Sequence, residues 1–225
     1  DSAGAAFFYA SGSLISGCSF TDNVSGRNGG GLQLHTSEAN IEDCVFTGNQ
    51  ASALGGAVHN WKGAPSFIRC TITDNTALTA GGGMSFIWNT TAEGNAIVED
   101  CVITRNVAQV EGGGLLLTTE TELTPDWLLV GNTTLCNNTP ENTNPNAGAP
   151  FVDLGGNCIS DVCDSDDDGT LDCDDPCPNW DGTCSEDGQT LFVVEGESIQ
   201  TAIDVVPVGG IVEVAAGTFQ PTTTL

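Results

Sequence analysis

The hydrophobic and polar residues of this chain follow a pattern that recurs four times with small changes. The recurring segments read GCSFTDN (17–23), DCVFTGN (43–49), RCTITDN (69–75) and DCVITRN (100–106). Each is followed by a glycine run that leads into apolar residues, namely GGGLQL, LGGAVH, GGGMSF and GGGLLL. Self-similarity at a period of about 20 to 50 residues is typical of repeat architectures, in which each unit packs on the next.

Within a unit, apolar and polar residues alternate around the cysteine, as in a half-buried β-strand. The apolar positions three residues before the cysteine are Ile15, Ile41, Phe67 and Val98. Those two residues after it are Phe20, Phe46, Ile72 and Ile103. A second strand is expected after each glycine run, as at 32–34 and 115–117. Units of this length without a helix cannot close a hydrophobic face alone, so we predict an all-β fold: a parallel β-helix (solenoid) of about five coils.

Stacked coils bring equivalent residues within about 4.7–4.9 Å of one another, the spacing of strands in a sheet. The repeat asparagines should therefore form one inward column whose amides hydrogen-bond along the axis: Asn23, Asn49, Asn75, Asn106 and Asn138. The glycine pairs 30–31, 55–56, 82–83 and 113–114 are expected at a corner too crowded for a Cβ. In a partial fifth unit, Thr133 replaces the cysteine and Cys136 takes the position of Thr104, which indicates that the solenoid is ending.

These repeats resemble those of right-handed parallel β-helix proteins of the pectin-lyase-like type, notably large bacterial surface proteins and the polymorphic outer-membrane proteins of chlamydiae. The resemblance covers roughly residues 12–140 and rests on the repetition of C-x-F-x-x-N and G-G-G-Φ. It implies a right-handed β-helix, which we assign to residues 1–160.

The charge of the chain narrows the range of partners. Thirty acidic residues face four basic ones, giving a formal net charge of −26. Such a surface repels phosphates and anionic membranes, so neither nucleic-acid binding nor membrane insertion is expected. No apolar run approaches the roughly 20 residues of a membrane span. Ten cysteines, an even number, indicate an oxidising compartment, and we expect an extracellular or cell-surface location after secretion.

The segment 161–188 is acidic and rich in cysteine, and we predict that it binds calcium. Its spacing fits D-x-D-x-D-G-x-x-D-x-x-D, which supplies the six or more oxygens that Ca²⁺ requires. The expected ligands are Asp164, Asp166, Asp168, the Thr170 carbonyl, Asp172 and Asp175. The sequence DSDDDGTLDCDDPCP also resembles a thrombospondin type 3 repeat. The alternative is a solvated acidic linker, which leaves the repulsion between these carboxylates uncompensated.

The segment 189–225 predicts a strand, a short helix that begins after Ser198, and a second strand at 211–215. It resembles the segment that opens and caps a β-helix in the same family. Because the sequence begins inside a coil and ends with this segment, joining the two ends gives an uninterrupted strand–turn–strand pattern. We therefore expect copies of the chain, or tandem units of it, to associate head to tail.

The cysteines divide into two groups. Cys18, Cys44, Cys70 and Cys101 occupy equivalent positions, where they could form disulfides between coils or a ladder of free thiols. Stacked side chains point in parallel, which favours the ladder of thiols. The remaining cysteines surround the acidic segment and are expected to form disulfides of undetermined connectivity: Cys136, Cys158, Cys163, Cys173, Cys177 and Cys184.

Trp61 and Trp88 both lie five residues after the last glycine of their run, so they are expected to stack on one outer face. Such a face could bind a glycan or contact another subunit. His35 and His59 do not share a column and are expected at the surface or in turns.

No constellation of catalytic residues is evident. A polysaccharide lyase needs a strong Arg or Lys base beside calcium-binding acids, but Arg27, Arg69 and Arg105 show no clustered partners in the sequence. A hydrolase needs two or three converging carboxylates, and Arg69 interrupts the acidic column of Asp43 and Asp100. The sequence thus predicts a structural protein, not an enzyme. The alternatives are an adhesin that binds carbohydrate, and a polysaccharide lyase or hydrolase.

Overall fold

The computed structural model describes residues 4–10, 12–88, 94–119, 127–143, 151–160, 163, 183–184, 190–193, 199–205 and 211–215. The chain divides into two compact units, Asp1–Asp161 and Val162–Leu225. Each unit is described by itself.

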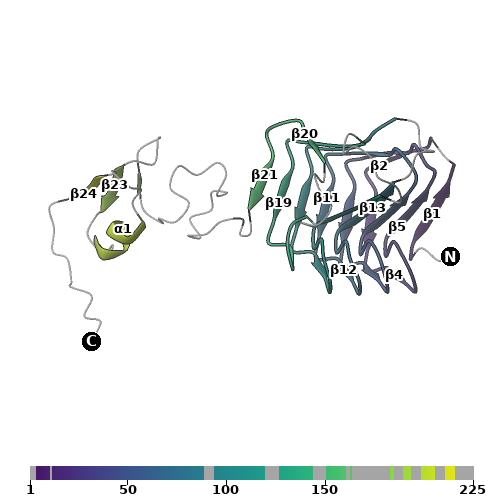
Figure 1. Ribbon diagram of the computed structural model, residues 1–225, viewed down its shortest axis with the longest axis horizontal. Helices are drawn as coiled ribbons and strands as arrows, with labels where there is room; N and C mark the ends of the chain where they lie inside the picture. The colour runs from purple at the N-terminus through teal and green to yellow at the C-terminus, as the bar shows by residue number, and fades with distance from the viewer. Residues whose placement is uncertain are drawn as a thin grey trace. The chain divides into compact units, whose positions relative to one another are not determined.

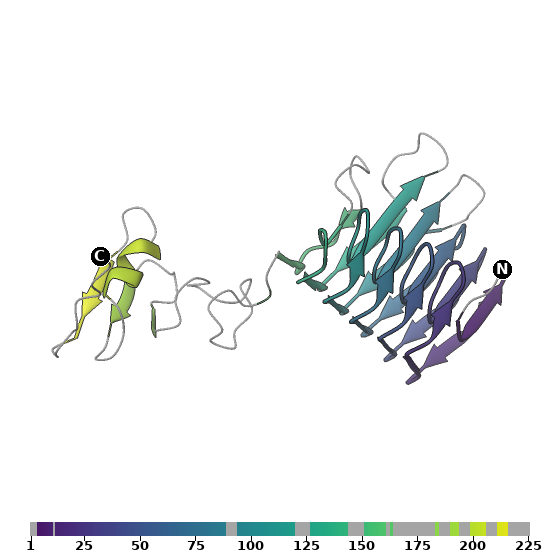
Figure 2. The same ribbon diagram turned by 90° about the horizontal axis from the view of Figure 1, so that it is seen from below.

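The first unit winds into stacked coils that form four parallel sheets, which we name A to D in the order in which the chain visits them (Figures 1 and 2). Sheet A contains β1 (Ala6–Tyr9), β5 (Leu32–His35), β9 (Val58–Trp61), β13 (Met84–Trp88) and β17 (Leu115–Thr119). Sheet B contains β2 (Leu14–Ser16), β6 (Asn40–Glu42), β10 (Ser66–Ile68), β14 (Ala96–Glu99), β18 (Leu128–Gly131) and β20 (Val152–Asp153). Sheet C contains β3 (Ser19–Thr21), β7 (Val45–Thr47), β11 (Thr71–Thr73), β15 (Val102–Thr104), β19 (Thr134–Cys136) and β21 (Cys158–Ser160). Sheet D contains β4 (Val24–Ser25), β8 (Gln50–Ala51), β12 (Thr76–Ala77) and β16 (Val107–Ala108).

The two sets of apolar positions around the cysteines form the core, as predicted. Register in sheet B aligns Ile15, Ile41, Phe67 and Val98. Register in sheet C aligns Phe20, Phe46, Ile72, Ile103 and Leu135. The later members of both columns are fully buried, and the rings of Phe20 and Phe46 stack at 4.6 Å. Removal of these columns from water is the main driving force that holds one coil on the next.

The corners of the coils require residues in the left-handed region of backbone conformation. In the first five coils, the corner between sheets B and C holds one such residue: Gly17, Asp43, Arg69, Asp100 and Asn132. The corner after sheet C holds another: Asp22, Gly48, Asp74, Arg105 and Asn137. Non-glycine residues pay a steric cost there, so each corner is held in shape by the coils around it.

The glycine runs lie at a crowded corner before sheet A, but the alignment differs from the expected one in the second coil. Gly30, Gly56, Gly82 and Gly113 form one column, in which a Cβ at each of the first three would collide with the carbonyl oxygen of the next. The partner of Gly31 is therefore Ala57, because the amide of Gly31 bonds to the Ala57 carbonyl at 2.9 Å. The predicted pair 55–56 is thus displaced by one residue.

The second unit contains β22 (Thr183–Cys184), β23 (Thr190–Val193), α1 (Ile199–Val205) and β24 (Ile211–Val214). β22 pairs antiparallel with β23, and β23 pairs parallel with β24 through the crossover that contains α1. The strand–helix–strand order agrees with the order predicted from the sequence. Ala202 of the helix is fully buried, together with Leu191 and Val193 of β23.

Candidate functional site

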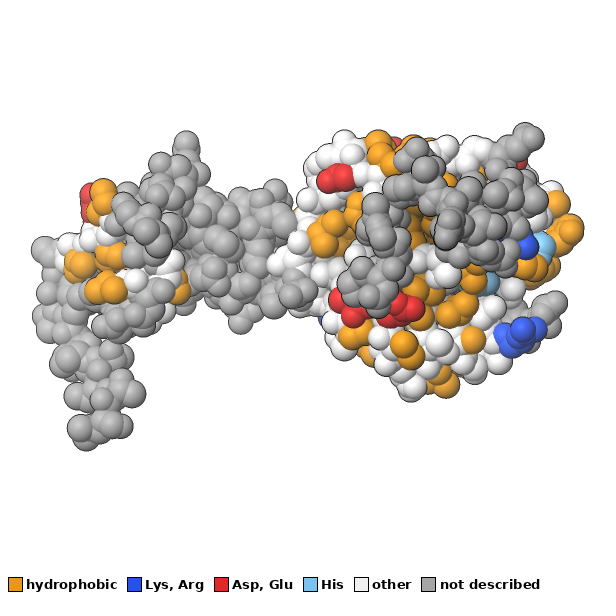
Figure 3. Space-filling model, in the orientation of Figure 1, with side chains coloured by type: hydrophobic (Ala, Val, Ile, Leu, Met, Phe, Trp, Pro, Cys, Tyr) orange, Lys and Arg blue, Asp and Glu red, His pale blue; other side chains and the backbone are white. Residues whose placement is uncertain are grey.

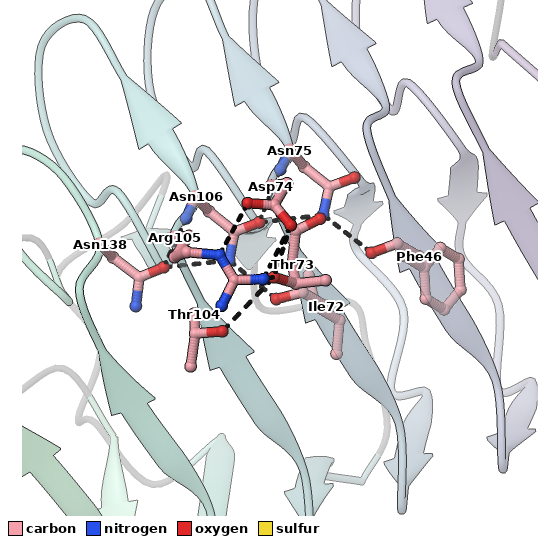
Figure 4. A network of polar contacts seen from close by, with 9 residues as sticks. All are labelled: Phe46, Ile72, Thr73, Asp74, Asn75, Thr104, Arg105, Asn106 and Asn138. Carbon is pink, nitrogen blue, oxygen red and sulfur yellow. Dashed lines mark hydrogen bonds and ion pairs between the residues drawn. The ribbon is translucent and has the colours of Figure 1, made fainter. Parts of the chain in front are cut away.

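A continuous ladder of asparagine side chains runs along the inside of the β-helix. Figure 4 shows three of its members, Asn75, Asn106 and Asn138. Each Nδ2 donates to the Oδ1 of the asparagine in the next coil, over 2.9 Å from Asn23 to Asn49, from Asn49 to Asn75 and from Asn75 to Asn106, and over 3.0 Å from Asn106 to Asn138. Each acceptor Oδ1 also receives the backbone N–H of the donor residue. Two donors thus converge on every buried carbonyl oxygen of the ladder, and this satisfies groups that would be costly to bury alone.

From Asn49 onward, the second hydrogen of each ladder amide also has a partner, a backbone carbonyl. Nδ2 of Asn75 donates to the carbonyl of Phe46 over 3.0 Å, and Nδ2 of Asn106 donates to the carbonyl of Ile72 over 2.9 Å. These carbonyls lie in the preceding coil, so each of these later amides bonds to both the preceding and the following coil. The ladder therefore fixes the register of three coils at each step.

The C-terminal end of the ladder is closed by a residue that the sequence reading missed. Nδ2 of Asn138 donates to Oδ1 of Asn142 over 2.8 Å, and Nδ2 of Asn142 donates to the carbonyl of Ser160 over 2.7 Å. Asn142 follows Asn138 by only four residues, so it lies outside the repeat spacing of 26 to 32 residues. No periodic signal could have identified it.

The repeat cysteines form a second column of equivalent residues. They are free thiols, as the ladder of thiols favoured from the sequence predicts. The amides of Cys18 and Cys70 donate to the Sγ atoms of Cys44 and Cys101 at 3.4 Å, and the amide of Cys101 donates to Oγ1 of Thr133. Burial raises the pKa of the Cys44 thiol, and the hydrogen bond with Cys70, together with burial, raises the pKa of Cys101. These thiols stay protonated and act as small buried groups rather than nucleophiles.

The described cysteines outside this column are oxidised rather than free thiols. Cys136, Cys158 and Cys163 are disulfide-bonded, in agreement with the prediction for this group. Disulfides persist in oxidising compartments and are rare in the cytosol, which supports a location outside the cytosol. Cys173 and Cys177, which were also expected to form disulfides, lie outside the described residues, and the side chain of Cys184 is not described.

Two arginines bridge neighbouring coils at the left-handed corners, although the sequence reading found no partners for them. Nε of Arg69 bonds to Oδ1 of Asp43 at 2.8 Å. Nε of Arg105 bonds to Oδ1 of Asp74 at 2.9 Å, and Figure 4 shows this second pair. The hydrogen bonds from these arginines lower the pKa values of Asp43 and Asp74. The paired residues are separated by 26 and 31 positions, so only the register of the coils brings them together. The pairs are half-exposed and contribute little stability.

The predicted stack of Trp61 on Trp88 is wrong. Register pairs Trp61 with His35 and with Ile87, whereas Trp88 pairs with Thr119. The error follows from the one-residue displacement of the second glycine run. The rings that pack on one another are instead those of Tyr9, His35 and Trp61. The ring centroids are 4.9 Å apart for Tyr9 and His35 and 4.2 Å apart for His35 and Trp61. Nζ of Lys62 lies 4.3 Å from the centroid of the Trp61 ring.

His59 is buried in β9 and not at the surface or in a turn, contrary to expectation. Its register partners are Gln33 and Ser85, and its Nδ1 lies 3.3 Å from Oγ of Ser85. Burial, with a smaller contribution from His35, lowers the pKa of His59 to about 4. His59 is therefore a neutral packing residue near pH 7. As expected, it does not share a column with His35.

The predicted calcium ligands between Asp164 and Asp175 lie outside the described residues. Among the residues that are described, no group of three or more His, Cys, Asp or Glu could hold a metal ion. None of the described helices is long and apolar enough to cross a membrane. Hydrophobic side chains lie scattered over the described part of one face of the solenoid, among polar side chains and backbone (Figure 3).

Comparison with known proteins supports the fold. Residues 1–97 match the family model described as a right-handed β-helix region. No curated protein and no solved structure matches the chain. The family match and the stacked parallel sheets agree, and the first unit is a right-handed parallel β-helix.

Proposed function

We propose that this chain is a structural protein of the cell exterior, a unit of a β-helical fibre or surface stalk whose copies associate head to tail. The observation that carries the proposal is the interior of the first unit, where stacked coils are joined in register by four parallel sheets and by the asparagine ladder.

The interior supports a mechanical role. The coils stack in register through four parallel sheets, and the asparagine ladder links every coil to the next. A solenoid of this kind resists bending because each coil is held by hydrogen bonds on both sides. Continued addition of coils lengthens the rod without a change of architecture.

Calcium binding by the acidic segment is part of the proposal. Asp164, Asp166, Asp168, the Thr170 carbonyl, Asp172 and Asp175 would supply hard oxygen ligands, and the bound ion would neutralise part of the charge of this segment. Removal of calcium with a chelator is expected to increase cleavage by proteases within 161–188, as measured by mass spectrometry of the fragments. Cleavage within the β-helix should stay unchanged, which provides the internal control. Equal cleavage of 161–188 with and without calcium would contradict the calcium assignment.

Negative-stain electron microscopy of the purified chain tests the fibre. We expect unbranched filaments with an axial repeat of several nanometres that become longer as protein concentration rises. Isolated particles at every concentration would refute head-to-tail association.

A glycan-binding adhesin is the second candidate, because Tyr9, His35 and Trp61 form an aromatic file on sheet A. It ranks below the fibre since Lys62 lies over the Trp61 ring and Tyr9 stacks on His35. Binding on a glycan array that is lost in Tyr9→Ala would favour this candidate. We propose no catalytic role: Arg69 and Arg105, candidate strong bases for a lyase, are both engaged in ion pairs.

A further inference from the structure

Sheet A carries a column of polar side chains on the face that points away from the hydrophobic core. Register aligns Gln33, His59 and Ser85 in β5, β9 and β13. Val58 and Met84, which precede two of them, belong to the core cluster, so the polar residues point to the opposite face. They are nevertheless 8%, 3% and 0% exposed. The outer column is therefore nearly as dry as the core, although its members are polar.

The glycine corner before sheet A packs directly on this column. A Cβ at Gly81 would lie 2.9 Å from the Cβ of Ser85, and a Cβ at Gly55 would lie 2.9 Å from the backbone N of His59. Both glycines have a φ of 67°, a conformation that glycine adopts without steric cost. The corner and the column thus hold each other in place, so a change in one displaces the other.

Hydrogen bonding within the column is incomplete. Nδ1 of His59 lies 3.3 Å from Oγ of Ser85. Oε1 of Gln33 is buried and has no hydrogen-bond partner among the described residues. A buried polar atom without a partner lowers the stability of the folded state. The column is therefore a weak point of the β-helix even while His59 is neutral.

The titratable groups around His59 are basic. Burial is the main cause of its lowered pKa, and His35 of the neighbouring β5 is the second. Burial and then Lys62, which follows β9, lower the pKa of His35. On the other side, β13 places only the uncharged Ser85 against His59, and the glycine corner has no side chains. In the part of the chain that the structure describes, no carboxylate therefore compensates a positive charge on His59.

We infer that His59 is an acid-sensitive latch between sheet A and the glycine corner. A proton taken from solvent charges the imidazole in a dry site without a counter-charge, and the corner moves off the sheet to let water reach the ring. The β-helix then opens at the coils that contain β9 and β13. This device belongs to the single chain and does not depend on head-to-tail association.

The pH range of the latch follows from the direction of the shift. The pKa of His59 is lowered from an ordinary value of 6.5 to about 4 in the folded chain. Between these values the unfolded chain binds more protons, so the contribution of His59 is fully present above pH 6.5 and is lost as the pH falls toward 4. Through His59 alone, the equilibrium constant for unfolding should rise roughly 20-fold from pH 7 to pH 5. Carboxylates with ordinary pKa values stay mostly ionised over this range.

Urea unfolding at pH 7 and pH 5, followed by circular dichroism, tests the latch. The wild-type chain should show the roughly 20-fold rise, whereas His59→Gln, which stays neutral, should change by no more than about threefold. His35→Gln is the matched control, because it removes an imidazole from the same sheet at a partly exposed position. This control should keep at least about a tenfold rise. An equal rise in the wild type and in His59→Gln would overturn the inference.

Two measurements on the wild-type chain test the latch without a substitution. In an NMR titration the ring of His59 should stay neutral until the pH approaches 4, and titration near its ordinary value of 6.5 would refute the latch. In amide hydrogen exchange at pH 5, Gly55 and Gly56, which bond to the next coil, should be at least about tenfold less protected than Thr134 of sheet C. Equal protection at these amides would show that the corner does not open by itself, which would also contradict the inference.

Discussion

Alanine at position 56 is expected to destabilise the β-helix by at least about 3 kcal/mol, the upper range for overpacking a core. A Cβ on Gly56 would fall onto the carbonyl oxygen of Gly82 and would lie 2.7 Å from the backbone N and C of Thr76. These are backbone atoms of the next coil, so no rotation of a side chain can relieve the overlap. The two coils would have to separate at this corner. Urea unfolding followed by circular dichroism measures the change in midpoint.

Gly31→Ala is the matched control, because Gly31 lies in the neighbouring column where the second coil already has Ala57. Its added Cβ would meet Ala57 O at 3.1 Å and the nearest side-chain atoms at 3.3 Å. We expect a loss of no more than about 1 kcal/mol, the size of an ordinary substitution. Equal shifts in Gly56→Ala and Gly31→Ala would show that the close contact between coils is not what requires glycine at 56.

Asn75→Leu is expected to cost roughly 3 kcal/mol or more, although leucine is similar in size and more hydrophobic. The substitution removes the acceptor for the backbone amide of Asn49 and one of the two donors to Oδ1 of Asn106. It also removes the donor to the Phe46 carbonyl. These groups are buried, and each one left without a partner costs about 1–3 kcal/mol.

Asn40→Leu provides the comparison for this prediction. Asn40 lies exposed on β6, where its Oδ1 accepts a hydrogen bond from Oγ of Ser66. Surface changes of this kind usually stay within about 0.5 kcal/mol. Thermal unfolding of both variants distinguishes them, and a neutral or stabilising Asn75→Leu would mean that the ladder contributes nothing to stability.

Most of the fold could be predicted from the sequence because the same residue types recur at equivalent positions in several repeat units. The columns of Ile41 and Phe46, the asparagine ladder and the free thiols all follow from a constant position within the unit. Any single unit would be ambiguous, whereas equivalent positions in several units restrict the chain to stacked coils. The strand–helix–strand order of the C-terminal segment followed from its own periodicity and its Pro and Gly residues.

The parts that escaped prediction depend on register at single-residue accuracy. One displaced residue in the second glycine run moved Trp61 opposite Ile87 rather than Trp88. The partners of Arg69 and Arg105 lie 26 and 31 residues away and become visible only when the corners are superposed. Asn142 closes the ladder from a position that the repeat does not specify. Burial of His59 depends on packing around sheet A, which residue type does not reveal.

The stacking of the coils is tested most directly by a solution NMR experiment on the side-chain amides of the asparagine ladder. Nuclear Overhauser contacts between amide protons should link Asn23 to Asn49, Asn49 to Asn75, Asn75 to Asn106 and Asn106 to Asn138, in that order. No contact should connect members that are two coils apart. Amide resonances with free-solvent shifts, or contacts in another order, would contradict the stacked coils on which the proposed fibre depends.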